Sequence, residues 1–382
     1  MRSPRMTDQR GVALPMAIFA LVVIGLLVAG TFFASRLEQQ SGQNTMFASQ
    51  AAEAAEAGLS DALGSTYSSA ASLQAIPVGG NSGWTTVSLA SGIAYTESVD
   101  RLTSSVYLYR SIGSRQSAGA TVATRSVGVL ARLVSMNIAV NAGLTALGDV
   151  TVGGNSTVSG TDATPPEWTA AGVSCPPTAD VTGVRYNGTL AQSGSSSVTG
   201  VPAPTVLDPS LNGSNIFGGT DFASLKALRT LTLAGDISGL APAVTGSPAV
   251  CNAAVQNNWG APTDQTSPCF NYFPVIYHYG DLSISGSGAG QGILLVEGNL
   301  NVQGQIDFYG PVIVTGGVNV RGTGSDDVKF YGGILAQDVT LDDSRLTGNA
   351  TVNYSSCAIR RALQGSAVPT PLSERSWVQL YN

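Results

Sequence analysis

Charged side chains are scarce in this chain of 382 residues, at 11% of the total, with 18 Lys and Arg against 24 Asp and Glu. Beyond Arg36 the basic residues are scattered and build no run. A duplex DNA-binding patch and a nucleic-acid partner are therefore not expected, although a few arginines brought together by folding remain an alternative. The chain is too apolar for disorder, and its 46 Gly favour an extracellular β-rich protein of two or three domains.

Residues for catalysis and metal binding are equally few. The single histidine, His278, has no recognisable Ser, Cys or Asp motif partner, and no Cys-x-x-Cys spacing exists, so we expect no catalytic residue and no metal site. The paired carboxylates Asp326-Asp327 and Asp342-Asp343 fall where turns are expected, which favours solvated corners over an acid/base or calcium site. The Gly-rich residues 286–292 lack the Lys of a phosphate-binding loop, so no cofactor is expected.

One long apolar run stands at the N-terminus, over residues 11–34, with no charge between Arg10 and Arg36. A helix rises about 1.5 Å per residue, so this run is long enough to cross a bilayer core of about 30 Å. The leader before it carries three Arg against one Asp, which predicts a cytoplasmic N-terminus and export of the rest. A signal peptide is the alternative, but its apolar core is shorter and ends at a cleavage site of small residues.

A helical pattern continues from the apolar run through residue 64. Good helix formers dominate residues 35–64 and Pro is absent there. Apolar residues recur at steps of three and four, in one narrow stripe that contains Leu37, Met46, Phe47, Ala51, Ala54, Ala55, Leu59 and Leu63. We therefore expect one helix over 12–64 that spans a membrane over 12–34 and is amphipathic afterwards.

These residues resemble a known family. The basic leader, Gly11, the apolar helix and the segment Ala-Ser-Gln-Ala-Ala-Glu-Ala-Ala-Glu-Ala-Gly-Leu at 48–59 are similar to type IV pilin-like proteins, and above all to the PilX-type minor pilins of type IV pilus assembly. The resemblance implies that a prepilin peptidase removes residues 1–11 as a leader, cutting after Gly11 and leaving Val12 as the new N-terminus. An ordinary uncleaved membrane anchor is the alternative.

The resemblance also implies partners, a location and a place in the fibre. Other pilins or pseudopilins, the pilus assembly machinery and the inner membrane are the implied partners, and an extracellular pilus or periplasmic pseudopilus is the implied destination. Most major pilins carry Glu at the fifth mature position, which is thought to pair with a neighbour's N-terminal amine. Met16 stands there in this chain, a departure that resembles tip or initiating subunits.

Four cysteines lie in the part predicted to be exported, and an even count there predicts two disulfides with three open connectivities. We favour Cys251–Cys269, which closes a local loop. Cys175–Cys357 then follows by elimination and closes the whole C-terminal region.

Residues 65–140 read as a loop followed by four strand-like runs from Trp84 onward, rich in β-branched and aromatic residues and separated by Gly and Ser. Short connections favour an antiparallel sheet, which we expect to pack on the amphipathic half of the long helix. The resemblance to pilins implies the same arrangement.

Near the C-terminus, short glycine-bounded units repeat. Leu282, Leu300, Val318 and Val339 hold one place in the unit, at steps of 18, 18 and 21, and two further unit types recur in phase. A period near 20 with several short strands predicts a parallel β-solenoid over 276–358, with residues 148–160 as a candidate earlier coil. The alternative is an antiparallel sandwich with coincidental spacing.

The remaining residues are less informative. Residues 141–275 read as irregular, with short helices expected over Asp221–Leu231 and Ser247–Asn258, and residues 359–382 read as a C-terminal tail. The predicted fold is therefore α+β followed by all-β: a membrane-spanning helix with a small antiparallel sheet, then a parallel solenoid. We interpret the chain as a structural minor pilin or pseudopilin that is not an enzyme. The alternatives are an uncleaved, tethered β-helix that acts as an adhesin for a surface ligand or polysaccharide, or a polysaccharide-active enzyme.

Overall fold

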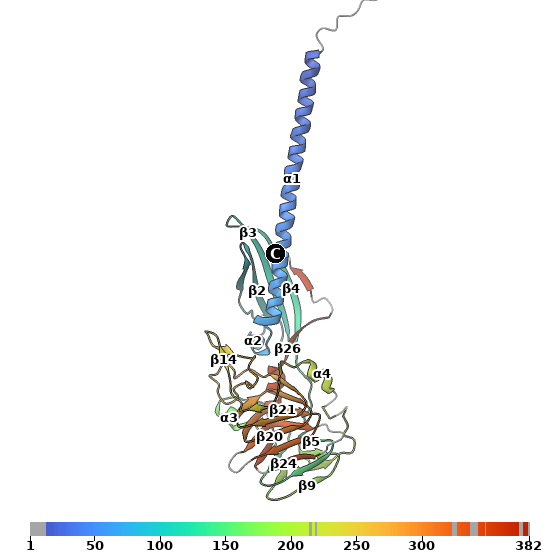
Figure 1. The fold of residues 1–382 in the computed structure, drawn as a ribbon, viewed down its shortest axis with the longest axis vertical. Coiled ribbons are helices and arrows are strands. Elements are labelled where there is room, and N and C mark those ends of the chain that lie inside the picture. The colour runs from blue at the N-terminus through green and yellow to red at the C-terminus, as the bar shows by residue number, and fades with distance from the viewer. Residues whose placement is uncertain are drawn as a thin grey trace, which may run out of the picture.

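A computed structural model describes residues 13–213, 216–217, 220–322, 327–336, 343–347, 349–373 and 377–380. A long N-terminal helix stands on an antiparallel sheet, and two parallel sheets lie beyond that sheet, at the end of the molecule opposite to the free part of the helix (Figure 1). The predicted leader and the predicted cleavage residues Gly11 and Val12 lie outside the described residues.

Helix α1 (Ala13–Asp61) has 49 residues and is about 74 Å long. It continues into a π-helical turn (Ala62–Thr66), and the short helix α2 (Ala70–Gln74) follows. The last third of α1 packs on the antiparallel sheet through small side chains, with Ala51, Ala55 and Leu59 at most 3% exposed. At Gly58 an added Cβ would lie 2.4 Å from the ring of Tyr95, so only glycine permits this close approach of helix and sheet.

Six strands form the antiparallel sheet in the part of the chain that the structure describes. They are β1 (Thr85–Ala90), β2 (Ile93–Arg101), β3 (Val106–Ser117), β4 (Ala120–Val134), β26 (Val368–Pro371) and β27 (Trp377–Leu380). The order is β1-β2-β3-β4-β26, with β27 also paired to β4. Tyr107, Tyr109 and Val129 from this sheet share one core with Leu59 of the helix. The predicted antiparallel sheet against the amphipathic half of the helix is confirmed.

The C-terminal residues differ from the predicted tail. Helix α5 covers Ser356–Gly365, and β26 and β27 then pair with β4 of the antiparallel sheet. Ser355 caps α5 by accepting a hydrogen bond from the backbone N–H of Ala358 at 3.2 Å, and Ile359 and Ala362 bury one side of the helix. The partner strand β4 lies more than 200 residues earlier in the chain, so local sequence patterns contain no sign of this pairing.

The parallel part has a larger and a smaller sheet, of twelve and seven strands within the described ranges. The larger sheet contains β5 (Ala142–Ala146), β7 (Thr157–Ser159), β8 (Thr182–Tyr186), β10 (Ser197–Thr199), β11 (Thr205–Leu207), β12 (Leu231–Thr232), β16 (Val275–Tyr279), β18 (Ser287–Gln291), β19 (Ile293–Glu297), β21 (Gln305–Val314), β23 (Val328–Ala336) and β25 (Ala350–Tyr354). The smaller sheet contains β6 (Asp149–Val152), β9 (Leu190–Gln192), β13 (Ile237–Ser238), β17 (Leu282–Ser285), β20 (Leu300–Gln303), β22 (Val318–Arg321) and β24 (Asp343–Thr347).

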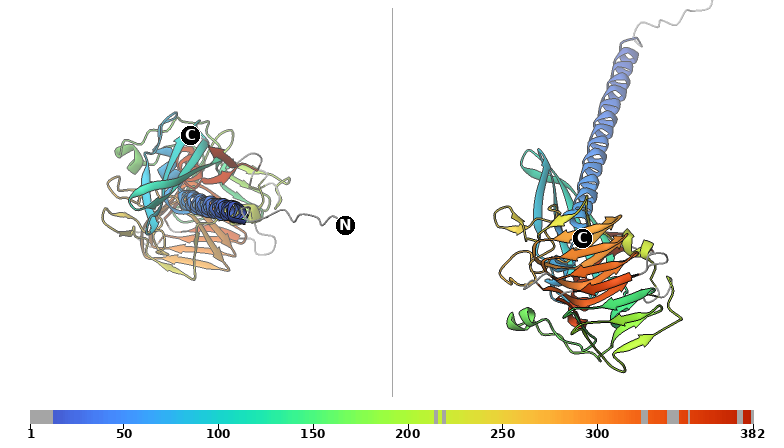
Figure 2. Two further views of the ribbon diagram at one scale, coloured as in Figure 1. Left: turned by 90° about the horizontal axis from the view of Figure 1, so that it is seen from above. Right: turned by 60° about the horizontal axis from the view of Figure 1, so that its bottom comes forward.

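Strands that are one repeat apart in the sequence lie side by side, as the right-hand view of Figure 2 shows. The paired rows are Ile276, Leu294, Val312 and Ile334 in the larger sheet and Leu282, Leu300 and Val318 in the smaller sheet. These rows keep the predicted step of 18 except between Val312 and Ile334, which are 22 residues apart, and both rows belong to one apolar core between the sheets. Val339, the fourth member of the predicted row, lies outside the described residues.

The strand β21 bends at Gly310, where φ is +140°. An added Cβ there would lie 1.9 Å from the carbonyl oxygen of Gly292 in the neighbouring repeat. Glycine is therefore required at this corner both by the backbone conformation and by the close contact between repeats.

The chain enters the parallel sheets in the middle of the stack. Strands β5, β6 and β7 pair with β23, β24 and β25, so residues 142–159 lie against the last C-terminal repeat and not before β16. Strands β8, β9 and β10 form a further repeat beyond them, and β11 pairs with β8 beyond that, within a region that the sequence analysis described as irregular. The chain then crosses to the other end of the stack at β12 and β13.

The short helices agree only in part with prediction. Asp221 caps α4 (Phe222–Ala227) by accepting a hydrogen bond from the backbone N–H of Ser224 at 2.6 Å, but the helix stops well before Leu231. The helix predicted over 247–258 is wrong: β14 (Val244–Thr245) pairs with β15 (Val250–Cys251), and turns follow. The side-chain amide of Asn258 donates to the carbonyl oxygens of Ala243 and Asn252, which holds this segment in a compact loop.

Candidate functional site

Residues 14–34 of α1 project away from the other described residues (Figure 1). All side chains from 14 to 46 are exposed, including Phe19 at 71% and Phe32 at 70%. The helix is long and apolar enough to cross a membrane, judged by length and composition, and a signal sequence near the N-terminus meets the same test. Met16, at the position singled out in the sequence, belongs to this exposed stretch.

The attachment of α1 to the antiparallel sheet ends in a polar contact. The hydroxyl of Tyr95 donates to Asp61 Oδ2 at 2.6 Å, and Ser65 also donates to the carboxyl group of Asp61. These hydrogen bonds, from Ser65 first and then from Tyr95, lower the pKa of Asp61 because they stabilise its charged form. The charged carboxylate therefore fixes the end of the helix to strand β2.

Two disulfides are present, in agreement with the even count of cysteines. They join Cys251 to Cys269 and Cys175 to Cys357, the pairs favoured from the sequence. Cys357 lies at the start of α5 and Cys175 follows the short helix α3 (Pro166–Ala170), so this bond ties together two segments that cover the larger sheet.

The outer side of the larger sheet is covered by other parts of the chain. Side chains of this sheet, such as Leu295, Ile313 and Leu335, are at most 1% exposed. They form a second core with residues from the connection after β4, from α3, from α4 and from α5: Met136, Ile138, Val140, Trp168, Leu225, Ile359 and Ala362. The larger sheet is thus buried on both sides.

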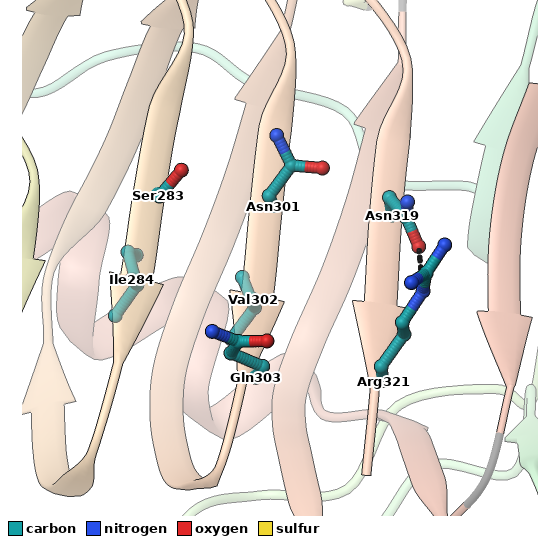
Figure 3. A pocket seen from close by; sticks show the side chains of 7 residues that line it. All are labelled: Ser283, Ile284, Asn301, Val302, Gln303, Asn319 and Arg321. Atoms are coloured by element: carbon teal, nitrogen blue, oxygen red, sulfur yellow. Dashed lines mark hydrogen bonds between the residues drawn. The ribbon is translucent and has the colours of Figure 1, made fainter.

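The described residues leave the outer side of the smaller sheet bare by contrast. It forms a shallow depression of about 390 Å³ lined by Ser283, Ile284, Asn301, Val302, Gln303, Asn319 and Arg321. Figure 3 shows the polar side chains of three neighbouring strands on this side, with Ser283, Asn301 and Asn319 in one row and Gln303 and Arg321 nearer the strand ends. We call these five polar residues the amide face.

Hydrogen bonds between repeats fix where the strands of the amide face begin. The carboxylate of Asp281 accepts hydrogen bonds from the backbone N–H of Asn299 at 2.8 Å and from its side-chain amide at 3.0 Å. The side-chain oxygen of Asn299 in turn accepts from the backbone N–H of Gly317 at 2.8 Å. This is a hydrogen-bonded ladder of Asp and Asn at matching corners, and it holds three repeats in register.

The amide face carries one fixed cation. Asn319 Oδ1 accepts a hydrogen bond from Arg321 Nε at 3.2 Å, and this is the dashed contact in Figure 3. In the described part of the chain neither terminal nitrogen of the guanidinium has a hydrogen-bond partner, so both are left for a ligand. Two parallel N–H groups of a guanidinium match the two oxygens of a carboxylate.

A charged cluster that the sequence analysis missed ties α4 to the larger sheet. Glu297 Oε2 accepts hydrogen bonds from Lys226 Nζ at 2.6 Å and from the Tyr277 hydroxyl at 2.5 Å. Donation by Lys226, and then by Tyr277, lowers the pKa of Glu297. No local sequence motif predicts such a contact, since its residues come from one helix and two strands that are separate in sequence.

Among the residues weighed for catalysis, those that the structure describes are not brought together as a nucleophile and base. His278 is buried in β16, with Nε2 3.0 Å from the carbonyl oxygen of Asp281. Asp326 and Asp342 lie outside the described residues. In the ranges that the structure describes, no group of three His, Cys, Asp or Glu side chains is placed to hold a metal ion.

Acidic side chains do gather at one place on the larger sheet. Burial raises the pKa of Asp307, the neighbouring Lys329 opposes this, and the charges of Glu167 and Asp327 add to it. Trp168 stacks on Tyr309 beside this cluster, with 5.3 Å between ring centroids, and both aromatic side chains are fully buried. The arrangement is that of a packed layer under α3 and not of an open substrate cleft.

Comparisons with known proteins add little to this geometry. No protein-family model and no curated protein sequence matches the chain. Among solved structures, the crystal structure of the competence-associated pilin ComZ from Thermus thermophilus is similar with a TM-score of 0.25 and 12% sequence identity, over 87% of this chain and 97% of that chain. A TM-score and an identity this low carry no argument about the fold or the function of this chain.

Proposed function

We propose that the chain is a pilin-like structural subunit, and the free apolar part of α1 is the observation that carries this proposal. Residues 14–34 span about 32 Å of helix, close to the bilayer core of about 30 Å, with every side chain exposed. Such a surface is unstable in water and needs either lipid or other apolar helices around it. The helix would first stand in the inner membrane and then pack among the helices of other subunits in a fibre.

The parallel sheets are interpreted as a β-solenoid that this anchor carries outside the membrane. Support comes from the 18-residue step between paired strands, from the alternate passage of the chain through both sheets, and from the single apolar core between them. Of the predicted residues 276–358, the solenoid then includes the described ones up to Tyr354, since 356–358 belong to α5, together with 142–159 and 182–207. The two disulfides suit an oxidising, extracytoplasmic compartment.

A position at the tip or start of the fibre follows from two features. Met16 offers no carboxylate to pair with a neighbour's N-terminal amine, the interaction implied by the resemblance to pilins. The parallel sheets extend the molecule at the end opposite to the free helix, and this bulk is hard to repeat at every place in a tightly packed fibre (Figure 1). A surface ligand or polysaccharide is the expected external partner.

The experiment is to determine the N-terminal residue by mass spectrometry, in protein recovered from membranes and from sheared surface fibres. We expect Val12 as the first residue in the fibre fraction, and a Gly11→Val variant confined to membranes with Met1 retained. Gly235→Val is the matched control, because Gly235 lies outside α1 and has no other atom within 4 Å of an added Cβ. A wild-type chain that keeps Met1 and never enters fibres would refute a processed subunit and favour the tethered adhesin or enzyme.

A further inference from the structure

The amide face has hydrogen-bonding groups that the protein itself does not use. Among the described residues, the side chains of Ser283, Asn301 and Gln303 make no hydrogen bond to the rest of the chain. Each primary amide offers both a donor and an acceptor, and the hydroxyl does the same. A ligand with many neutral groups that both donate and accept is the chemical complement of this row.

The same groups are held on a rigid and regular frame. The side chains that alternate with them, Ile284, Val302 and Val320, point into the core and are at most 2% exposed. Neighbouring strands in a sheet lie about 4.8 Å apart, so equivalent side chains recur at that spacing from repeat to repeat. A repeating receptor of this kind is suited to a repeating polymer that lies across the strands, and its rigidity lowers the entropic cost of binding.

The charge of the face differs in sign from that of the chain. The protein has a formal net charge of −6, but among the residues that line the depression Arg321 alone is charged, and it is a cation. Asn319 orients its guanidinium and leaves the terminal N–H groups outward. Local positive charge beside neutral amides favours an anionic ligand that also carries hydroxyl groups.

We propose that the amide face binds an acidic polysaccharide, which lies across β17, β20 and β22 with sugar hydroxyls on Asn301, Gln303 and Ser283 and a uronate carboxylate on Arg321. This inference rests on the proposed function, because that function places the face outside the cell where such polymers occur. It names the class of ligand and the residues that recognise it, both of which the proposed function leaves open.

The test is binding of the full-length chain, purified in detergent micelles, to three immobilised polymers by biolayer interferometry. Alginate carries hydroxyls and carboxylates, dextran carries hydroxyls without charge, and poly-glutamate carries carboxylates without sugar rings. We expect alginate to bind at least about tenfold more tightly than either of the others, the ratio expected from hydrogen bonds to a charged group. Equal binding of dextran, or equal binding of poly-glutamate, would overturn the proposal, as would no binding to alginate.

Variants separate this face from the rest of the surface. We expect Arg321→Gln to weaken alginate binding about tenfold and to reduce its salt dependence, and the double variant Asn301→Ala/Asn319→Ala to weaken it further. Arg125→Gln, an exposed position on β4, removes the same charge elsewhere and should leave binding unchanged. If Arg125→Gln weakens alginate binding as much as Arg321→Gln does, only the overall charge matters and the proposal fails. If the chain self-associates and Arg321→Gln abolishes that association, the occupant of the amide face is a second copy of the chain and not a polysaccharide.

The outcomes for ligand and for fibre are independent. Alginate binding by a chain that keeps Met1 would uphold the ligand and refute the processed pilin. A chain that starts at Val12 in fibres but does not distinguish the three polymers would do the reverse.

Discussion

The outer sides of the two parallel sheets differ in the residues that the repeats place there. In the larger sheet these positions hold residues such as Leu295, Ile313 and Tyr331, and α3, α5 and the connection after β4 cover them. In the smaller sheet the equivalent positions hold Asn301 and Asn319, and the described chain leaves them open. Both sheets share one inner core, so the need for a stable fold accounts for the apolar residues that point inward from each sheet. On the outer sides, the same need accounts for the apolar residues of the larger sheet but not for the polar residues of the smaller sheet.

The comparison indicates where to look for function in a repeated fold. Substituting residues on the covered outer side should lower the free energy of unfolding and leave ligand binding unchanged. Substituting residues on the bare outer side should weaken ligand binding and leave the free energy of unfolding unchanged. The predictions below test this separation, from the largest expected effect to the smallest.

Removing the Cys175–Cys357 disulfide, which joins the segments that cover the outer side of the larger sheet, should have the largest effect on stability. In the double variant Cys175→Ser/Cys357→Ser, a loop of 182 residues loses its cross-link, and we expect the free energy of unfolding to fall by about 4–5 kcal/mol. Cys251→Ser/Cys269→Ser opens a loop of 18 residues and should cost about 3 kcal/mol. Chemical unfolding of the full chain in detergent measures both, and a larger loss from the short loop would contradict the expected order.

Single residues from the two outer sides give a matched pair. Ile313→Ala removes a fully buried side chain from the covered side and should cost about 3 kcal/mol, because the packed layer can close the cavity only in part. Asn301→Ala removes an exposed amide and should change the free energy of unfolding by less than about 0.5 kcal/mol. Thermal unfolding compares the two variants directly. Similar losses at the two positions would mean that the bare side also contributes to folding.

Much of this architecture follows from local patterns in the sequence. The helix is evident from the apolar run and the stripe that ends in Leu63, and the parallel rows are evident from the step of 18 between Leu282, Leu300 and Val318. The amide face was also present in these repeats, as the polar residues that alternate with Leu and Val. It was not recognised, because the sequence does not say which outer side the rest of the chain covers.

The features that were not predicted depend on contacts between distant residues. The pairing of β26 with β4, and the entry of residues 142–159 beside the last repeat, join segments that are about 190 to 240 residues apart. The predicted helix over 247–258 failed because Asn258 and the disulfide at Cys251 hold a loop that local helix propensity cannot anticipate.

The last prediction concerns how pH changes the stability contributed by Asp162, which lies among the segments that cover the larger sheet. Asp162 joins the segment before α3 to the start of α5: its carboxylate accepts hydrogen bonds from the backbone N–H and hydroxyl of Thr178, at 2.7 and 2.9 Å, and from those of Ser356, at 2.8 and 2.7 Å. Burial raises the pKa of Asp162, but the four hydrogen bonds outweigh it and the net pKa is lowered. Asp162→Asn should cost about 1.5 kcal/mol at neutral pH, because its NH₂ group then faces donors.

A lowered pKa fixes the sign of the pH effect. The contribution of Asp162 is fully present above the pKa of the unfolded chain, about 3.9, and is lost as the pH falls through the lower pKa of the folded state. The difference in melting temperature between wild type and Asp162→Asn should therefore be constant from pH 7 to about pH 5 and shrink below about pH 4. Arg321→Gln, on the bare side, should track wild type across the same range. A wild-type advantage that grows on acidification would mean that Asp162 is protonated in the folded cover and that its contacts with Thr178 and Ser356 are not those of a carboxylate.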